Sequence, residues 1–219
     1  MRKWTTWFTL SLMALACAPE TRRESADTDW WTEADRQFIL SELDRTTVEL
    51  ESEITGLSDN QWNFHEALNR WTMGEIVEHL EMQNQLHYRE ISVTANGPQY
   101  LAFRTITKDQ DIYFSNYSSD TTAGKAQWFL EPLGRFNSSK KGWEAFIRAR
   151  SALAEFVAKT NIDLRKQFTY RTPVEGKKIS DLKIGQVRDL HQLLLTGIAH
   201  TDRHLRQIRH IKTHPDYPK

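Results

Sequence analysis

The sequence predicts an all-α protein built as an antiparallel four-helix bundle. Apolar side chains recur at three- and four-residue spacing along four long stretches, which is the period of helices buried on one face. Only nine glycines and six prolines occur in 219 residues, so these helices meet few breaks. The strict apolar-polar alternation of a half-buried strand is scarce. Four such helices bury their apolar faces against one another as a bundle.

The first helix is expected over about residues 31–55, which contain neither glycine nor proline. Thr32 and Asp35 near its start are candidate caps. Its apolar positions at helical spacing are Phe38, Leu43, Leu50 and Ile54. Gly56 and the polar residues after it end the helix.

The second helix is expected from residue 73 to about residue 93. Thr72 followed three residues later by Glu75 predicts a capping box at its start. Asn96, Gly97 and Pro98 end it.

The third and fourth helices follow a less regular stretch over residues 99–135, in which residues 115–124 are the most loop-like. The third helix is expected from Ser138 or Ser139 to about Thr160. The fourth is expected to begin within residues 180–185 and to reach about residue 212, before Pro215.

The N-terminal segment has the pattern of a secretory signal. Two cations at positions 2 and 3 precede an uncharged run over residues 4–16, which is shorter than the ~20 residues of a membrane-spanning helix. Residues 14–17 (ALAC) resemble a bacterial lipobox, in which the signal is cut before a cysteine that becomes lipidated, and they also suit ordinary signal peptidase. We expect residues 1–16 to be a signal peptide and Cys17 the lipidation site. Ala18 stands where aspartate would resemble an inner-membrane retention signal, which favours an outer-membrane lipoprotein; the other option is a periplasmic protein.

The expected mature chain is a polar tether over residues 17–30 followed by one domain over residues 31–213. The formal charge of the whole chain is zero and it has no long basic run. Nucleic-acid binding is therefore not expected, because phosphate recognition needs clustered Lys and Arg. The membrane is expected to be reached through the lipid anchor alone, and a homodimer is one oligomeric option.

Three histidines are candidate metal ligands. His200 and His204 stand at i and i+4 of the fourth helix, on one face, where two imidazoles can chelate one divalent metal. His79 lies on the margin of the buried side of the second helix and can meet them across the bundle. Three histidine ligands would leave positions open for water or substrate, as a catalytic metal needs.

Other interpretations of the histidines stay open. A helical i, i+4 pair is more commonly exposed or hydrogen-bonded than metal-bound, and the residues between His200 and His204 exclude a zincin HExxH motif. His191 points away from the pair and is expected to be a surface or packing residue. The histidines for which solvent exposure is expected are His65, His210 and His214.

Two segments resemble one known family. Residues 71–80 (WTMGEIVEHL) are similar to the tryptophan-plus-helix motif of the DinB-like (YfiT-like) superfamily of four-helix-bundle proteins, and residues 200–208 (HTDRHLRQI) are similar to its C-terminal motif. With the break at residues 56–59, the resemblance covers about residues 32–212. It implies a divalent metal, nickel, zinc or iron, held by His79, His200 and His204. Relatives include thiol-dependent transferases and putative hydrolases, so the fold alone does not identify the reaction.

The sequence therefore favours a metal-dependent enzyme of the cell envelope, thiol S-transferase-like or hydrolase-like, with a small-molecule substrate. Gln83 and His87, one and two turns beyond His79, are expected to line the substrate pocket as donors or a proton carrier. The alternative is a non-catalytic envelope lipoprotein that binds a small ligand or a protein partner, and metal storage ranks last. A secretion signal speaks against a thiol transferase, because low-molecular-weight thiols are chiefly cytoplasmic.

Overall fold

The computed structural model describes residues 29–116, 126–170 and 176–219. The expected signal peptide, Cys17, all but the end of the tether, and residues 117–124 of the expected loop lie outside them. Four long helices dominate the described chain: α1 (Glu33–Ile54), α3 (Met73–Ala95), α6 (Ser139–Lys159) and α7 (Leu190–Lys212). The shorter α-helices are α2 (Asp59–Trp62), α4 (Arg104–Thr107) and α5 (Asp111–Asn116). Four short 3-10 helices are η1 (Leu101–Phe103), η2 (Trp128–Leu130), η3 (Leu164–Lys166) and η4 (Ile179–Asp181). The all-α prediction is confirmed.

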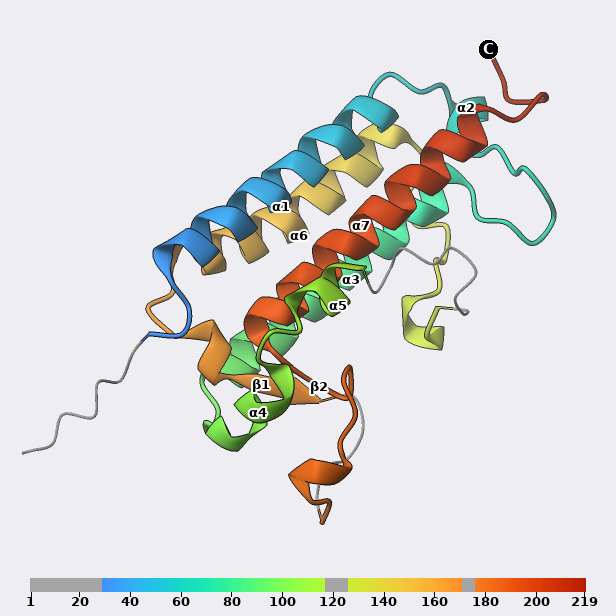
Figure 1. Cartoon of the computed structure of the whole chain (residues 1–219). Helices are drawn as coiled ribbons and strands as arrows, with labels where there is room; N and C mark the ends of the chain where they lie inside the picture. The colour runs from blue at the N-terminus through green and yellow to red at the C-terminus, as the bar shows by residue number, and fades with distance from the viewer. Residues whose placement is uncertain (1–28, 117–125, 171–175) are drawn as a thin grey trace, which may run out of the picture.

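The four long helices lie side by side (Figure 1). Both α1 and α3 pack against both α6 and α7. The antiparallel order holds for α1 with α6, where Arg36 near the start of α1 donates to the carbonyl of Thr160 just after α6, and for α3 with α7. The pairs α1 with α7 and α3 with α6 run parallel (Figure 1), and Lys212 at the end of α7 accordingly reaches Glu53 at the end of α1. The connection between α3 and α6 must therefore return along the bundle.

Trp62 on α2 packs between the long helices α3 and α6. Its ring is fully buried, and its indole N–H donates to the carbonyl of Phe136 at 2.8 Å. A methyl group at Gly74 of α3 or at Gly142 of α6 would lie 2.7 Å from this ring, well inside van der Waals contact. The two glycines therefore let α3 and α6 close around the tryptophan.

Most predicted helix bounds agree with the structure, and the start of α7 does not. Residues 180–185, expected to open the fourth helix, form the end of η4 and a turn in which Gly185 has a φ of 86°. The chain then enters strand β2 (Val187–Asp189), which pairs antiparallel with β1 (Phe168–Tyr170). Asp189 ends the strand and caps α7 by accepting the backbone N–H of Gln192 at 2.8 Å. Because the capping residue is also the last residue of a strand, the spacing of apolar residues does not show where the helix starts.

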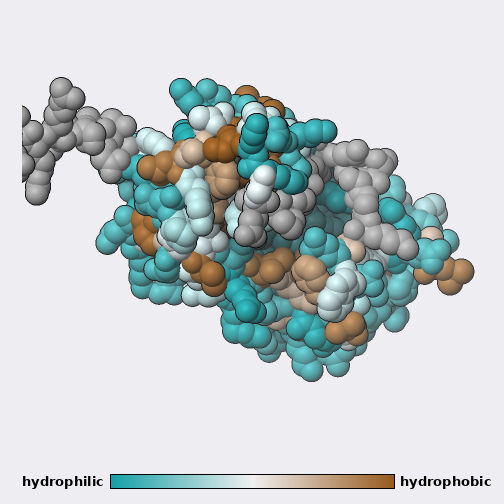
Figure 2. All heavy atoms as spheres, turned by 90° about the horizontal axis from the view of Figure 1, so that it is seen from below, coloured by the Kyte–Doolittle hydropathy of each residue, from teal (hydrophilic) through white to brown (hydrophobic). Residues whose placement is uncertain are grey.

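Within the described residues, no helix is both long and apolar enough to span a bilayer. Seen from below (Figure 2), most of the surface is hydrophilic, and the hydrophobic side chains form separate small patches. The apolar core instead lies between the long helices, in clusters around Leu43, Leu193, Trp62 and Leu205.

Candidate metal centre

The first ligand candidate, His79, lies in the second turn of α3. The predicted capping box fixes where this helix begins: Thr72 accepts the backbone N–H of Glu75 at 3.1 Å, and the Glu75 carboxylate accepts the backbone N–H of Thr72 at 2.7 Å. Trp71 precedes the cap, and its ring lies 4.9 Å from that of His79. The cap therefore holds the buried imidazole of His79 beside Trp71.

His200 and His204 meet His79 across the interface of α3 and α7. The Nε2 atom of His200 lies 2.9 Å from Nε2 of His79 and 3.1 Å from Nε2 of His204. The three rings offer nitrogen atoms that all lie within 4.8 Å of one another. His79 and His204 are buried and His200 is half-buried. The structure thus brings together the three histidines that the sequence singled out.

The outer ring nitrogens of two histidines are held by acceptors. Nδ1 of His79 donates to the carbonyl oxygen of Leu130 at 2.8 Å, and Nδ1 of His204 donates to Oε1 of Gln207 at 2.9 Å. A neutral imidazole that carries its proton on Nδ1 has a lone pair on Nε2. Both lone pairs therefore face Nε2 of His200.

Burial lowers the pKa of all three imidazoles, because removing water penalises the charged form. Burial lowers the pKa of His204 to about 3, with the neighbouring His79 adding to the effect. The pKa of His200 falls well below its ordinary value because of burial and then because of His204 and His79. Burial also lowers the pKa of His79, and the nearby cation of Arg203 contributes. The rings are thus neutral at pH 7, the state that ligates metals.

The arrangement of nitrogens fits a divalent metal. Nε2 of His200 can donate one N–H, either to His79 or to His204. One of the two Nε2 lone pairs then remains without a hydrogen-bond donor. A cation bound by all three Nε2 atoms would satisfy every lone pair, and nitrogens that share a metal at about 2.1 Å lie roughly 3.0–3.4 Å apart. Imidazole suits nickel, zinc and iron, and the described group contains no carboxylate or thiolate.

An ion-pair network with buried carboxylates holds the carbonyl that orients His79. The Glu78 carboxylate accepts the backbone N–H groups of Leu133 and Arg135 at 2.9 and 3.0 Å. The Arg135 guanidinium bridges Glu78 and Glu81, both at 2.7 Å. This network ties residues 130–135 to α3 and keeps the Leu130 carbonyl against His79. The sequence analysis missed it, because a backbone carbonyl in an irregular stretch carries no side-chain signature.

The two predicted pocket residues contact each other. Nε2 of Gln83 donates to Nε2 of His87 at 2.7 Å. His87 is buried and packs against α7 at Gly197, where a methyl group would lie 2.8 Å from its Nδ1. A positive charge on His87 would disfavour protonation of His200, and this repulsion is one of the causes that lower the pKa of His200. A role of this pair in substrate binding stays a prediction.

The other histidines lie outside the cluster. His191 is buried and accepts the indole N–H of Trp31 at 3.2 Å, which is the packing role expected of it. His65 and His210 are exposed as expected. His214 is half-buried instead, because its ring packs 5.4 Å from that of Phe64.

Comparison with known proteins identifies the family. The family model of the DinB superfamily matches residues 42–208, which include all three clustered histidines. No curated protein and no solved structure gives a significant match. The match spans most of the chain and both segments that resemble the family motifs, and the chain belongs to the DinB superfamily.

Proposed function

We propose that this protein binds one divalent metal ion, nickel, zinc or iron, through His79, His200 and His204. The observation that carries the proposal is the convergence of the three Nε2 atoms at 2.9 and 3.1 Å. Membership of the DinB superfamily supports it. Two of the three rings are already held in the tautomer that a metal requires.

We further propose that the site serves a metal-dependent enzyme of the thiol S-transferase or hydrolase type. A divalent metal bound here would act as a Lewis acid toward an oxygen or sulfur nucleophile. The protein residues would orient and shield it: Leu130 and Gln207 hold the ligand rings, and Trp71, stacked over His204 at 6.2 Å, screens one side from water. The pair of Gln83 and His87 offers a site for holding a proton on the same face of α3.

The metal is tested by elemental analysis of the purified chain. We expect about one equivalent of metal per chain, and its loss in His204→Ala. The matched control is His210→Ala, an exposed histidine of the same helix, which should keep the metal. A folded protein that stays metal-free after growth in supplemented medium would sink the proposal. Conjugation assays with several thiols, beside an esterase and amidase panel, then separate transferase from hydrolase.

A second candidate function is a non-catalytic protein that binds a small ligand or partner. It is favoured by the lack of a carboxylate in the described histidine group and by the engagement of Glu78 and Glu81 with Arg135. The described group of histidines then offers no general base other than histidine itself. Metal binding without turnover in any of these assays would favour this function.

We also propose that the protein resides in the cell envelope, held by a lipid on Cys17. The proposal rests on residues 1–17 alone, which precede the described part of the chain. Cys17→Ser should release the protein from membranes during fractionation, and an unchanged distribution would argue against lipidation.

A further inference from the structure

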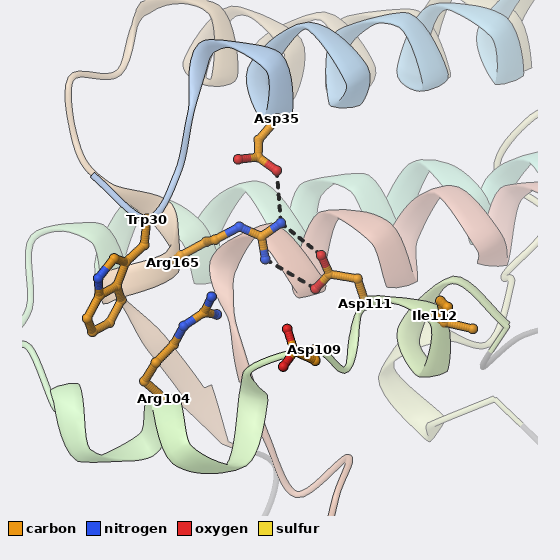
Figure 3. Close-up of a pocket in the computed structure, with 7 residues that line it drawn as sticks. All are labelled: Trp30, Asp35, Arg104, Asp109, Asp111, Ile112 and Arg165. Atoms are coloured by element: carbon orange, nitrogen blue, oxygen red, sulfur yellow. Dashed lines mark hydrogen bonds and ion pairs between the residues drawn. The ribbon is translucent and has the colours of Figure 1, made fainter. Parts of the chain in front are cut away.

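A second candidate site lies at the end of the bundle where α1 and α7 begin. A cavity of about 390 Å³ opens there between Trp30, which precedes α1, and the residues around α4 and the start of α5 (Figure 3). The clustered histidines lie elsewhere, in the second turn of α3 and from the middle of α7 onward. The cavity falls within the size range of small-molecule sites, about 300–1,000 Å³.

One wall of the cavity is a saturated ion-pair network. Arg165, whose side chain is only 9% exposed, donates to both oxygens of Asp111 at 3.1 and 2.8 Å and to Asp35 at 2.9 Å. Burial alone would raise the pKa of Asp35, but its hydrogen bonds from Arg165 and Thr32 lower it to about 2. These three charges already satisfy one another, so this wall gives shape to the cavity and leaves ligand recognition to other groups.

Arg104 supplies a cation with spare hydrogen-bond donors. Its guanidinium makes one contact with a carboxylate, at 3.3 Å to Asp189, and lies 5.4 Å from the centre of the Trp30 ring. A guanidinium has five N–H donors in a fork that matches a carboxylate. Within the described chain, no other polar partner of Arg104 is found. Figure 3 shows this guanidinium turned toward the centre of the cavity.

Asp109 supplies a carboxylate with no partner among the described residues. Its backbone has a φ of 63°, and no other non-glycine residue in the described chain adopts a positive φ. Such a conformation is tolerated by aspartate better than by most residues and is enriched at ligand sites. Figure 3 shows its side chain facing the same space as Arg104, with no contact between the two.

We propose that this cavity binds a free α-amino acid. The ligand carboxylate pairs with Arg104 and the ligand ammonium with Asp109. A simple anion is disfavoured because three carboxylates line the cavity against two guanidinium groups, and a simple amine leaves Arg104 without its second acceptor. A zwitterion satisfies both free charges together.

The test is titration calorimetry of the full chain with L-leucine and two analogues that each lack one charge. 4-Methylpentanoate lacks the ammonium group and 3-methylbutylamine lacks the carboxylate. Loss of one charge-assisted hydrogen bond should weaken binding about tenfold or more. We expect saturable binding of leucine and at least this loss for each analogue. No binding of leucine, or equal binding of either analogue, would overturn the proposal.

Substitutions in the protein give the complementary test. Asp109→Asn keeps the positive φ accessible and removes the charge, and Arg104→Gln removes the guanidinium. Each should weaken leucine binding about tenfold or more, whereas the exposed controls Lys108→Gln and Asp44→Asn should not. Binding that survives Asp109→Asn unchanged would contradict the site.

Because α-amino acids also chelate divalent metals, leucine binding is measured in His204→Ala as well. Retained affinity in that variant supports the cavity. Loss of binding there would assign leucine to the histidine cluster and overturn this inference, while leaving the metal proposal intact.

Discussion

The buried and half-buried histidines on α7 occupy two different environments at the scale of single residues. His200 and His204 face other imidazoles, whereas His191 lies between the indole of Trp31 and the carboxylate of Asp111, 3.7 Å from its Nε2. Burial, reinforced by the cation of Arg165, lowers the pKa of His191 from its ordinary 6.5 to about 4. At a pH between these two values, the imidazole of His191 is therefore protonated in the unfolded chain and neutral in the folded chain.

This difference predicts how stability depends on pH. Between about pH 6.5 and 4 the unfolded state takes up more protons, so the free energy of unfolding falls as the pH drops through that window. From pH 7 to 5 the contribution of His191 to this loss is about 2 kcal/mol. His191→Asn, which keeps an acceptor for Trp31, should show a loss smaller by about that amount in urea titrations at the two pH values.

The comparison uses the slope with pH, so any constant cost of the substitution cancels. The exposed His210→Asn should behave like the wild-type chain. An unchanged pH slope in His191→Asn would show that His191 takes up its proton equally in both states.

At the scale of an element, residues 130–135 connect an ion-pair network to a metal-ligand candidate. Arg135 is half-exposed, but the carboxylates that it joins, Glu78 and Glu81, are buried. Removing the guanidinium leaves these carboxylates short of their partner, which is costly away from water. The backbone of this segment, and with it the Leu130 carbonyl, should then lose its fixed place against His79.

Arg135→Gln is therefore expected to lower metal affinity about tenfold, the usual cost of losing a partner that orients a ligand. The measurement is competition with a chromophoric chelator, under conditions in which circular dichroism shows the variant folded. Arg148→Gln, at an exposed arginine of α6, is the control. A variant that melts at a lower temperature yet keeps full metal affinity would reduce the network to a structural role.

Elements with a local start signal could be predicted from the sequence. The candidate cap Thr32 and the predicted capping box of Thr72 with Glu75 place the starts of α1 and α3 correctly. The start of α7 could not be placed, because Asp189 is positioned by pairing with Phe168, a contact between residues far apart in the chain. The parallel packing of α3 on α6 likewise depends on the long connection between them, which has no periodic signal.

The same distinction applies to the site. His200 and His204 share one helix face, so their proximity follows from spacing. The place of His79 on the buried margin of its helix allows this approach, the family resemblance implies it, and the fold shows it. The Leu130 carbonyl and the positive φ of Asp109 could not be foreseen, because both depend on how irregular segments pack.

At the scale of the whole molecule, the proposed metal would join two long helices. His79 belongs to α3, while His200 and His204 belong to α7, and an ion bound only by the folded chain stabilises it by mass action. With free metal at 100 times its Kd, this amounts to about 2.7 kcal/mol.

Removing the metal should therefore lower the melting temperature. For a chain of this size about 2–4 °C are lost per kcal/mol, so a chelator should shift the midpoint by roughly 5–10 °C. Thermal unfolding followed by circular dichroism checks this, and His204→Ala should melt at one temperature with or without chelator. A chelator shift that persists in His204→Ala would place the stabilising ion elsewhere.

The separation of the ligands along the chain bears on the order of folding. The contact between His79 and His200 closes a loop of 121 residues, whereas His200 and His204 are four residues apart. Contacts between distant residues form late, because the entropy of the enclosed loop must be lost before they contribute. For the proposed ion, the α7 pair would be available as soon as one helical turn exists, whereas the third nitrogen would be in place only after α3 docks. Tight retention of the metal should therefore mark the last step of folding.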